Sequence, residues 1–155
     1  MNYFGFIQQY VCLSRFIVLY KKMPQQAIIL FDGVCNLCNG WVRFLIKRDE
    51  KLKFRFASLQ SEAGQSRLET IGLPVDVMET VIYIRDKQYF SESSAVLEIL
   101  KDLGGIWKIV FFFRLIPKRI RDSIYWFIAK HRYRIFGKRS SCMFPTLELE
   151  KRFLL

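Results

Sequence analysis

The chain has few of the residues from which disulfide scaffolds and metal centres are built. Its 155 residues include 4 cysteines and 1 histidine, and this number of cysteines is too small for a fold held together by disulfides. Cysteine usage of this kind fits a reducing compartment, in which paired cysteines are catalytic or bind a metal. We therefore expect a cytoplasmic protein and leave peripheral contact with a membrane open.

Long unbroken apolar runs are also missing. The apolar residues 1–19 are interrupted by Gln8, Gln9 and Arg15, whereas a transmembrane helix requires ~20 consecutive apolar residues. The same stretch lacks the basic start and the small-residue cleavage site of a signal peptide. It is therefore a poor candidate for either a membrane span or a secretion signal.

Residues 1–23 are interpreted as an extension of a single domain that covers residues 24–155. Three interpretations of this extension stay open. It is a helix packed on the domain, a helix lying on a membrane surface, or the product of an early start codon with Met23 as the true first residue. Cys12, which lies within it, has no assigned role beyond that of a buried or incidental thiol.

Acidic residues are scarce relative to basic ones. The 14 Asp and Glu stand against 25 Lys and Arg, which gives a net charge of +11. Most of this excess lies in residues 108–139, which hold 10 basic residues and 1 acidic residue, Asp122. An anionic membrane surface that contacts residues 118–139 would account for the excess, and so would a solvated helix face. No nucleic-acid-binding motif accompanies the charge, which argues against nucleic acid as the partner.

The residues that carry chemistry lie between 27 and 48. Residues 27–31 (AIILF) form an apolar run that is typical of a strand buried on both faces, and the turn dipeptide Asp32-Gly33 follows. Next come Cys35 and Cys38 in a C-x-x-C spacing, and then apolar residues recur at helical intervals as far as residue 48. A strand, a C-x-x-C and a helix in this order are the thioredoxin-like placement.

This placement predicts thiol–disulfide exchange. The first turn of a helix carries unpaired N–H groups and the positive end of the helix dipole, which favour a thiolate at Cys35. Cys38 lies one turn further on the same side, at a spacing that suits a disulfide. We expect Cys35 to attack and Cys38 to resolve the mixed disulfide, with protein or small-molecule thiols and disulfides as partners and no bound cofactor.

Two other interpretations of the cysteines stay open. Cys35 and Cys38 could be part of a zinc site in a non-enzymatic adaptor, together with Cys142 and His131, although these two form no second paired motif. The cysteines could also be structural or vestigial in a basic membrane-surface module. Asp32 likewise has two possible roles, as a general base for the resolving thiol or as the residue that holds the turn and caps the helix.

The remaining pattern predicts an α/β fold with a thioredoxin-like core in the order β-α-β-α-β-β-α. The expected strands are 27–31, 52–58, 80–84 and 88–90, and the expected helices are 35–48, 61–71 and one that Ser93 or Ser94 caps and that runs to residue 103. A C-terminal extension at 106–155 adds a helical pair. Its apolar first helix, 106–116, is interpreted as packing on the core or under a partner, and its second helix, 118–136, carries an apolar stripe with most basic residues off it.

The turn and its two cysteines resemble the D-x-x-C-x-x-C signature of the DCC family of thiol–disulfide oxidoreductases. The residues that match are Asp32-Gly33-Val34-Cys35-Asn36-Leu37-Cys38. The resemblance spans about residues 24–155. It continues at Ser91, Ser94 and Ala95, at residues 103–105, and in a closing pattern of Tyr125, Ala129, His131, Arg132, Tyr133, Arg134, Phe136, Gly137, Lys138, Cys142, Pro145, Arg152, Phe153 and Leu154.

The resemblance implies a redox chemistry for the Cys35–Cys38 pair and an approach of Ser91 and Ser94 to the cysteines, although capping of a helix explains these serines equally. A cysteine stands at the place of Cys142 in this family, and it could be a third redox thiol, a zinc ligand or a packing residue. One departure concerns the strand at 80–84. Thioredoxins carry a cis-proline before this strand that docks the substrate chain, and here no proline directly precedes it.

Overall fold

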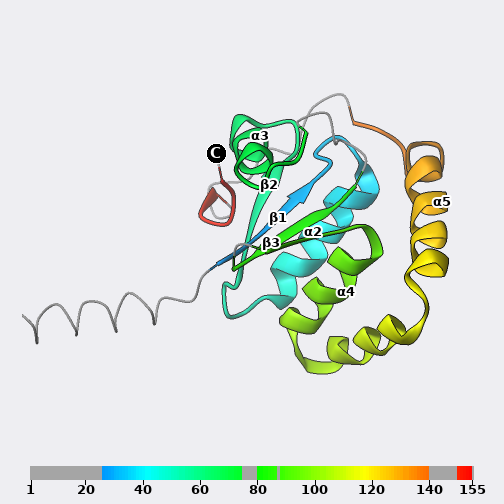
Figure 1. Ribbon diagram of the computed structural model, residues 1–155. Helices are drawn as coiled ribbons and strands as arrows, with labels where there is room; N and C mark the ends of the chain where they lie inside the picture. The colour runs from blue at the N-terminus through cyan, green and yellow to red at the C-terminus, as the bar shows by residue number, and fades with distance from the viewer. Residues whose placement is uncertain (1–25, 75–79, 87, 140–149, 155) are drawn as a thin grey trace, which may run out of the picture.

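The computed structural model describes residues 26–74, 80–86, 88–139 and 150–154. Its architecture is a single sheet with helices on both faces (Figure 1). In chain order the elements are β1 (Ala27–Phe31), α2 (Asn36–Arg48), β2 (Phe54–Ser58), α3 (Glu62–Thr70), β3 (Ile82–Arg85), β4 (Gln88–Ser91), α4 (Glu92–Leu103), the 3-10 helix η1 (Gly105–Leu115) and α5 (Lys118–Phe136). The expected extension at 1–23 lies outside the described residues.

The four strands form one mixed sheet in the order β2-β1-β3-β4. β1 runs parallel to β2, with Ile29 opposite Phe56, and antiparallel to β3, with Ile29 opposite Tyr83. The parallel pair is joined by a crossover that contains α2, as a parallel connection requires. β1 is therefore an interior strand, and the dithiol follows directly at its C-terminal end.

Both faces of β1 are buried because its side chains alternate between two apolar clusters. Phe31 packs on one face with Val42 of α2 and Ile99 of α4. Leu30 packs on the other face with Leu68 of α3. The helices α2 and α4 thus cover one side of the sheet and α3 the other (Figure 1), which explains why the strand reads as a continuous apolar run.

The predicted thioredoxin-like core in the order β-α-β-α-β-β-α, with C-terminal helices added, is confirmed. Ser61 caps α3 as its position suggests, because its Oγ accepts the backbone N–H of Gly64 at 3.1 Å. The capping prediction for α4 is wrong. Its N-cap residue is Ser91, and Ser93 instead donates its hydroxyl to Asp122 of α5 and so joins the two helices.

The predicted C-terminal helical pair is present, and its first member is a 3-10 helix. η1 consists of 3-10 turns, and none of its residues is buried, although Trp107 packs edge-on against Phe44 of α2. α5 has its expected bounds and lies at the outer edge of the molecule, against α2 and α4 (Figure 1). Its apolar stripe is exposed to solvent and consists of Ile120, Ile124, Phe127, Ile128 and Ile135. Among the described residues, no helix is both long and apolar enough to cross a membrane.

Two glycines in helices, Gly64 of α3 and Gly40 of α2, test how closely α3 packs on β2. A Cβ at Gly64 of α3 would lie 2.0 Å from the backbone oxygen of Ser58, whereas a Cβ at Gly40 of α2 meets nothing within 4 Å. We expect Gly64→Ala to lower the free energy of unfolding by about 1–3 kcal/mol through overpacking. Gly40→Ala should raise it by roughly 0.5–1 kcal/mol, because alanine favours a helix. Urea unfolding of both variants checks this, and equal stability of the two would contradict the close packing of α3 on β2.

Candidate functional site

The two cysteines lie together at the start of α2. Cys35 is the N-cap residue of this helix and Cys38 is in its first turn. The cysteines approach to 3.6 Å, and both are free thiols. A short movement of the side chains would therefore bring the sulfurs to bonding distance, as a dithiol that forms a disulfide requires.

Asp32 holds the turn that leads from β1 to these cysteines. One oxygen of its carboxylate accepts hydrogen bonds from the backbone N–H of Val34 at 3.1 Å and from the side-chain amide of Gln60 at 2.9 Å. The other oxygen accepts from the guanidinium of Arg132 at 2.8 Å and from the hydroxyl of Tyr133. The turn role of Asp32 is thus confirmed, but no side chain caps α2.

Arg132 comes from α5 and forms a buried ion pair with Asp32. Its side chain is only 5% exposed and that of Asp32 only 1%. Arg132 itself is therefore not part of a solvated helix face, which is one of the explanations given above for the basic excess of residues 118–139. The inward face of α5 carries Asp122 and Arg132, the partners of Ser93 and Asp32, and most of the apolar stripe is left exposed.

The chain that follows α5 covers Cys35. The backbone of Arg139 donates to the carbonyl of Val34 at 2.8 Å, and the backbone of Asn36 donates to the carbonyl of Gly137 at 3.4 Å. Cys35 and Lys138 thereby form an isolated antiparallel bridge. Cys35 is consequently fully buried, with an exposed fraction of 0%.

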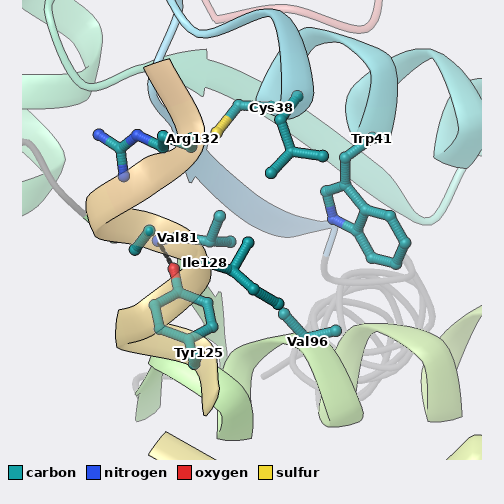
Figure 2. A pocket seen from close by; sticks show the side chains of 9 residues that line it. Cys38, Trp41, Val81, Val96, Tyr125, Ile128 and Arg132 are labelled. Atoms are coloured by element: carbon teal, nitrogen blue, oxygen red, sulfur yellow. Dashed lines mark hydrogen bonds between the residues drawn. The ribbon is translucent and has the colours of Figure 1, made fainter. Parts of the chain in front are cut away.

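Cys38 instead borders a cavity of about 260 Å³ that lies between α2, α4 and α5. Figure 2 shows the side chains of Trp41, Val96, Tyr125 and Ile128 around it, with the Arg132 guanidinium turned away. The full lining consists of Leu37, Cys38, Trp41, Val81, Val96, Tyr125, Ile128, Ala129 and Arg132. The two thiols therefore have different surroundings, one under a segment of chain and one beside a mainly apolar space.

The pKa of Cys38 is raised to about 12, mainly by burial and also by the charge and the hydrogen bond of the neighbouring Cys35. The positive charge of Arg132 lowers the pKa of Cys38, whereas the negative charge of Asp32 raises it. Cys38 is thus a protonated thiol at neutral pH. Whichever thiol reacts first, Cys38 must therefore lose its proton during the reaction.

Cys142 and Cys12 lie outside the described residues, so their roles stay predictions. His131 is bonded through its Nδ1 to the carbonyl of Phe127. Within residues 26–74, 80–86, 88–139 and 150–154, no group of three or more His, Cys, Asp or Glu side chains is arranged to hold a metal ion.

The fold and the dithiol define a thioredoxin-like α/β protein, and comparison with known proteins gives its family. A family model for the DCC1-like thiol-disulfide oxidoreductases matches residues 29–138. The chain is 48% identical over 134 residues to the uncharacterized protein YuxK of Bacillus subtilis, a match that covers 86% of this chain and 97% of that protein. No solved structure matches it.

A second relative is a chloroplastic DCC family protein of Arabidopsis thaliana. It is 39% identical over 124 residues, which cover 79% of this chain and 72% of that protein. With a family model over more than two thirds of the chain and relatives of this similarity, the protein belongs to the DCC1-like thiol-disulfide oxidoreductase family.

Three residues of the site could not be found by reasoning from spacing alone. Gln60, Tyr125 and Arg132 reach the region of the cysteines from elements far away in the sequence. Tyr125 and Arg132 do occur in the C-terminal pattern that resembles the DCC family, and this resemblance was the signal in the sequence that could have pointed to them. Gln60 carried none, because a single glutamine after a strand is an ordinary surface residue.

The Asp32–Arg132 ion pair can be tested by a double-mutant cycle. Arg132→Met leaves a buried carboxylate without its cation, so we expect a loss of about 3–5 kcal/mol in the free energy of unfolding. Asp32→Asn combined with Arg132→Met should lose less than the two single variants together, because neither charge is then left unpaired. Lys130→Met, at an exposed position of the same helix, is the control and should change stability by about 0.5 kcal/mol at most. Additive losses in urea unfolding would show that the two charges do not interact.

Proposed function

We propose that this protein is a thiol–disulfide oxidoreductase whose Cys35 and Cys38 alternate between a dithiol and a disulfide. The observation that carries the proposal is the pair of free thiols 3.6 Å apart at the start of α2. Membership of the DCC1-like family supports it. In each cycle the cysteines exchange two electrons and two protons with an external thiol or disulfide through a mixed disulfide.

The contacts of Asp32 favour a supporting role in this reaction. Its carboxylate already accepts four hydrogen bonds, two at each oxygen, so no lone pair is directed at Cys38 by the contacts described. We propose that Asp32 keeps the turn and Arg132 in place, and that the Arg132 guanidinium offsets the negative charge near the thiols. Cys142 stays a candidate for a third redox thiol that accepts the disulfide from the pair.

Reduction of bis(2-hydroxyethyl) disulfide, a small uncharged disulfide, with dithiothreitol as electron donor tests the proposal. We expect the protein to accelerate this reaction, and we expect Cys35→Ser and Cys38→Ser each to lower the rate at least about tenfold, since each removes one half of the dithiol. Ser123→Ala, at an exposed position of α5, is the control and should keep the rate. A Cys35→Ser protein as fast as the unchanged chain would refute the proposal.

A second candidate function is contact with an anionic membrane surface through η1 and α5. Large apolar side chains are exposed along both elements, including Ile109, Phe112, Leu115, Ile124 and Phe127. Basic residues lie among them, and among the described residues Lys108, Arg119, Lys130 and Arg134 form no ion pair. Exposed apolar side chains combined with unpaired cations suit the interface of a bilayer that contains anionic lipids.

Liposome flotation tests this second candidate. We expect the protein to float with vesicles that contain phosphatidylserine and to remain behind with vesicles of phosphatidylcholine alone, and added salt should weaken the binding. Phe112→Ser together with Phe127→Ser should abolish flotation, because insertion of both rings is lost. Leu52→Ser, at an exposed leucine far along the chain from both elements, is the matched control. Equal flotation of all variants, or none of the unchanged protein, would rule the surface out.

A further inference from the structure

We propose that the cavity beside Cys38 is the substrate site and that it takes a small, uncharged, apolar thiol or disulfide, whose sulfur meets Cys38 first. This inference rests on the redox function proposed above and names its substrate class. The cavity of about 260 Å³ lies near the lower end of the roughly 300–1,000 Å³ that is usual for small-molecule pockets. A compact aromatic or aliphatic group is of the right size.

The access to the two sulfurs favours Cys38 as the point of contact. Cys38 lines the cavity, whereas Cys35 does not and is covered by the bridge to Lys138. An external molecule in the cavity therefore meets Cys38, whereas Cys35 is fully buried within the core cluster and is reached only after the packing around it has opened. This order is the reverse of the one that the position of Cys35 at the helix start predicts.

The chemistry of the cavity wall favours an uncharged ligand. Most of the lining side chains are apolar, and Tyr125 and Arg132 are already engaged, so that among the described residues the indole N–H of Trp41 is the polar group of the lining without a hydrogen-bond partner. The hydroxyl of Tyr125 accepts the backbone N–H of Val81 at 3.0 Å and lies 3.1 Å from the hydroxyl of Thr80. Arg132 is paired with Asp32. The carboxylates of a charged thiol would lose water and gain at most this one donor, and its ammonium group would meet no carboxylate in the lining, so an uncharged ligand is favoured.

The backbone around the dithiol argues against an extended peptide as the substrate. A peptide that pairs with an open strand edge needs free N–H and C=O groups there. Beside the cysteines these groups are taken by the chain itself, because Tyr125 accepts from Val81 and the residues after α5 pair with Val34 and Asn36. The same α5 that closes the cavity thus occupies the positions where a protein substrate would dock.

The reaction balances with the substrate alone. For a disulfide, the Cys38 sulfur attacks one substrate sulfur, the substrate S–S bond breaks and the first thiolate leaves. Cys35 then attacks the Cys38 sulfur, the Cys35–Cys38 bond forms and the second thiolate leaves. The two protons of the cysteines pass to the two product thiols, so the substrate gains two electrons and the protein loses them. An apolar thiol is oxidised by the reverse steps.

A pair of probes that differ in charge tests the site. The reduced full chain is mixed with 4,4′-dithiodipyridine, which is neutral and aromatic, or with oxidised glutathione, which is charged, and peptide mass spectrometry locates the adducts. We expect Ala129→Phe, which fills the cavity from α5, to slow the reaction with dithiodipyridine about tenfold or more and to leave that with glutathione within about twofold. Ser123→Phe adds the same ring outside the cavity and should leave both rates unchanged.

Two further variants keep the test decisive if Ala129→Phe fails to fold. In Cys35→Ser, dithiodipyridine should label Cys38 rapidly, and in Cys38→Ser it should label Cys35 at least about tenfold more slowly, because only Cys38 borders the cavity. The Cys38 rate should rise with pH from 7 to 9 without a plateau. Faster labelling of Cys35, or equal slowing of both probes by Ala129→Phe, would overturn the proposed site but leave the redox function intact. An unchanged protein in which neither cysteine reacts with either probe would refute the redox function itself.

Discussion

The buried ion pair between Asp32 and Arg132 is the contact on which the arrangement of this site depends. It joins the turn after β1, which positions the cysteines, to the helix α5, which begins some ninety residues later in the chain. A charge that is as fully buried as Asp32 is tolerated only with a partner of opposite sign and several hydrogen bonds, and Arg132, Tyr133 and Gln60 supply them. Without α5, the thioredoxin-like core would expose both the cysteines and an unpaired carboxylate.

The docking of α5 also sets the character of the space around the thiols. Asp122 and Arg132 of this helix point inward and most of its apolar stripe is exposed, unlike an ordinary amphipathic helix on a soluble core, although Ile128 of the stripe also lines the cavity. Towards the sheet, it closes a small, mainly apolar cavity against Cys38. Towards solvent, it presents isoleucine and phenylalanine among basic residues that form no ion pair within the part of the chain that the structure describes. One helix therefore connects the proposed chemistry at the dithiol with the proposed contact at a membrane.

The core could be predicted from the sequence, because local patterns determine it. The apolar run of β1, the Asp32-Gly33 turn and the helical spacing after Cys38 are each local, and together they placed the dithiol correctly. The inward face of α5 could not be predicted in this way. Burial of Arg132 depends on a carboxylate one hundred residues away, and hydrophobic periodicity places arginine in solvent by default. For the same reason the cover over Cys35 and the cavity beside Cys38 were not foreseen, since both are made by tertiary contacts of α5 and the residues after it.

The most direct test of the central claim is a redox titration of the Cys35–Cys38 pair against mixtures of reduced and oxidised glutathione, with mass spectrometry counting the remaining thiols. The account predicts that the two thiols disappear together as one intramolecular disulfide. The transition should involve two electrons, so that a tenfold change in the ratio of dithiol to disulfide corresponds to about 30 mV. Two thiols that persist across the whole range, or cysteines that end only as separate glutathione adducts, would contradict it.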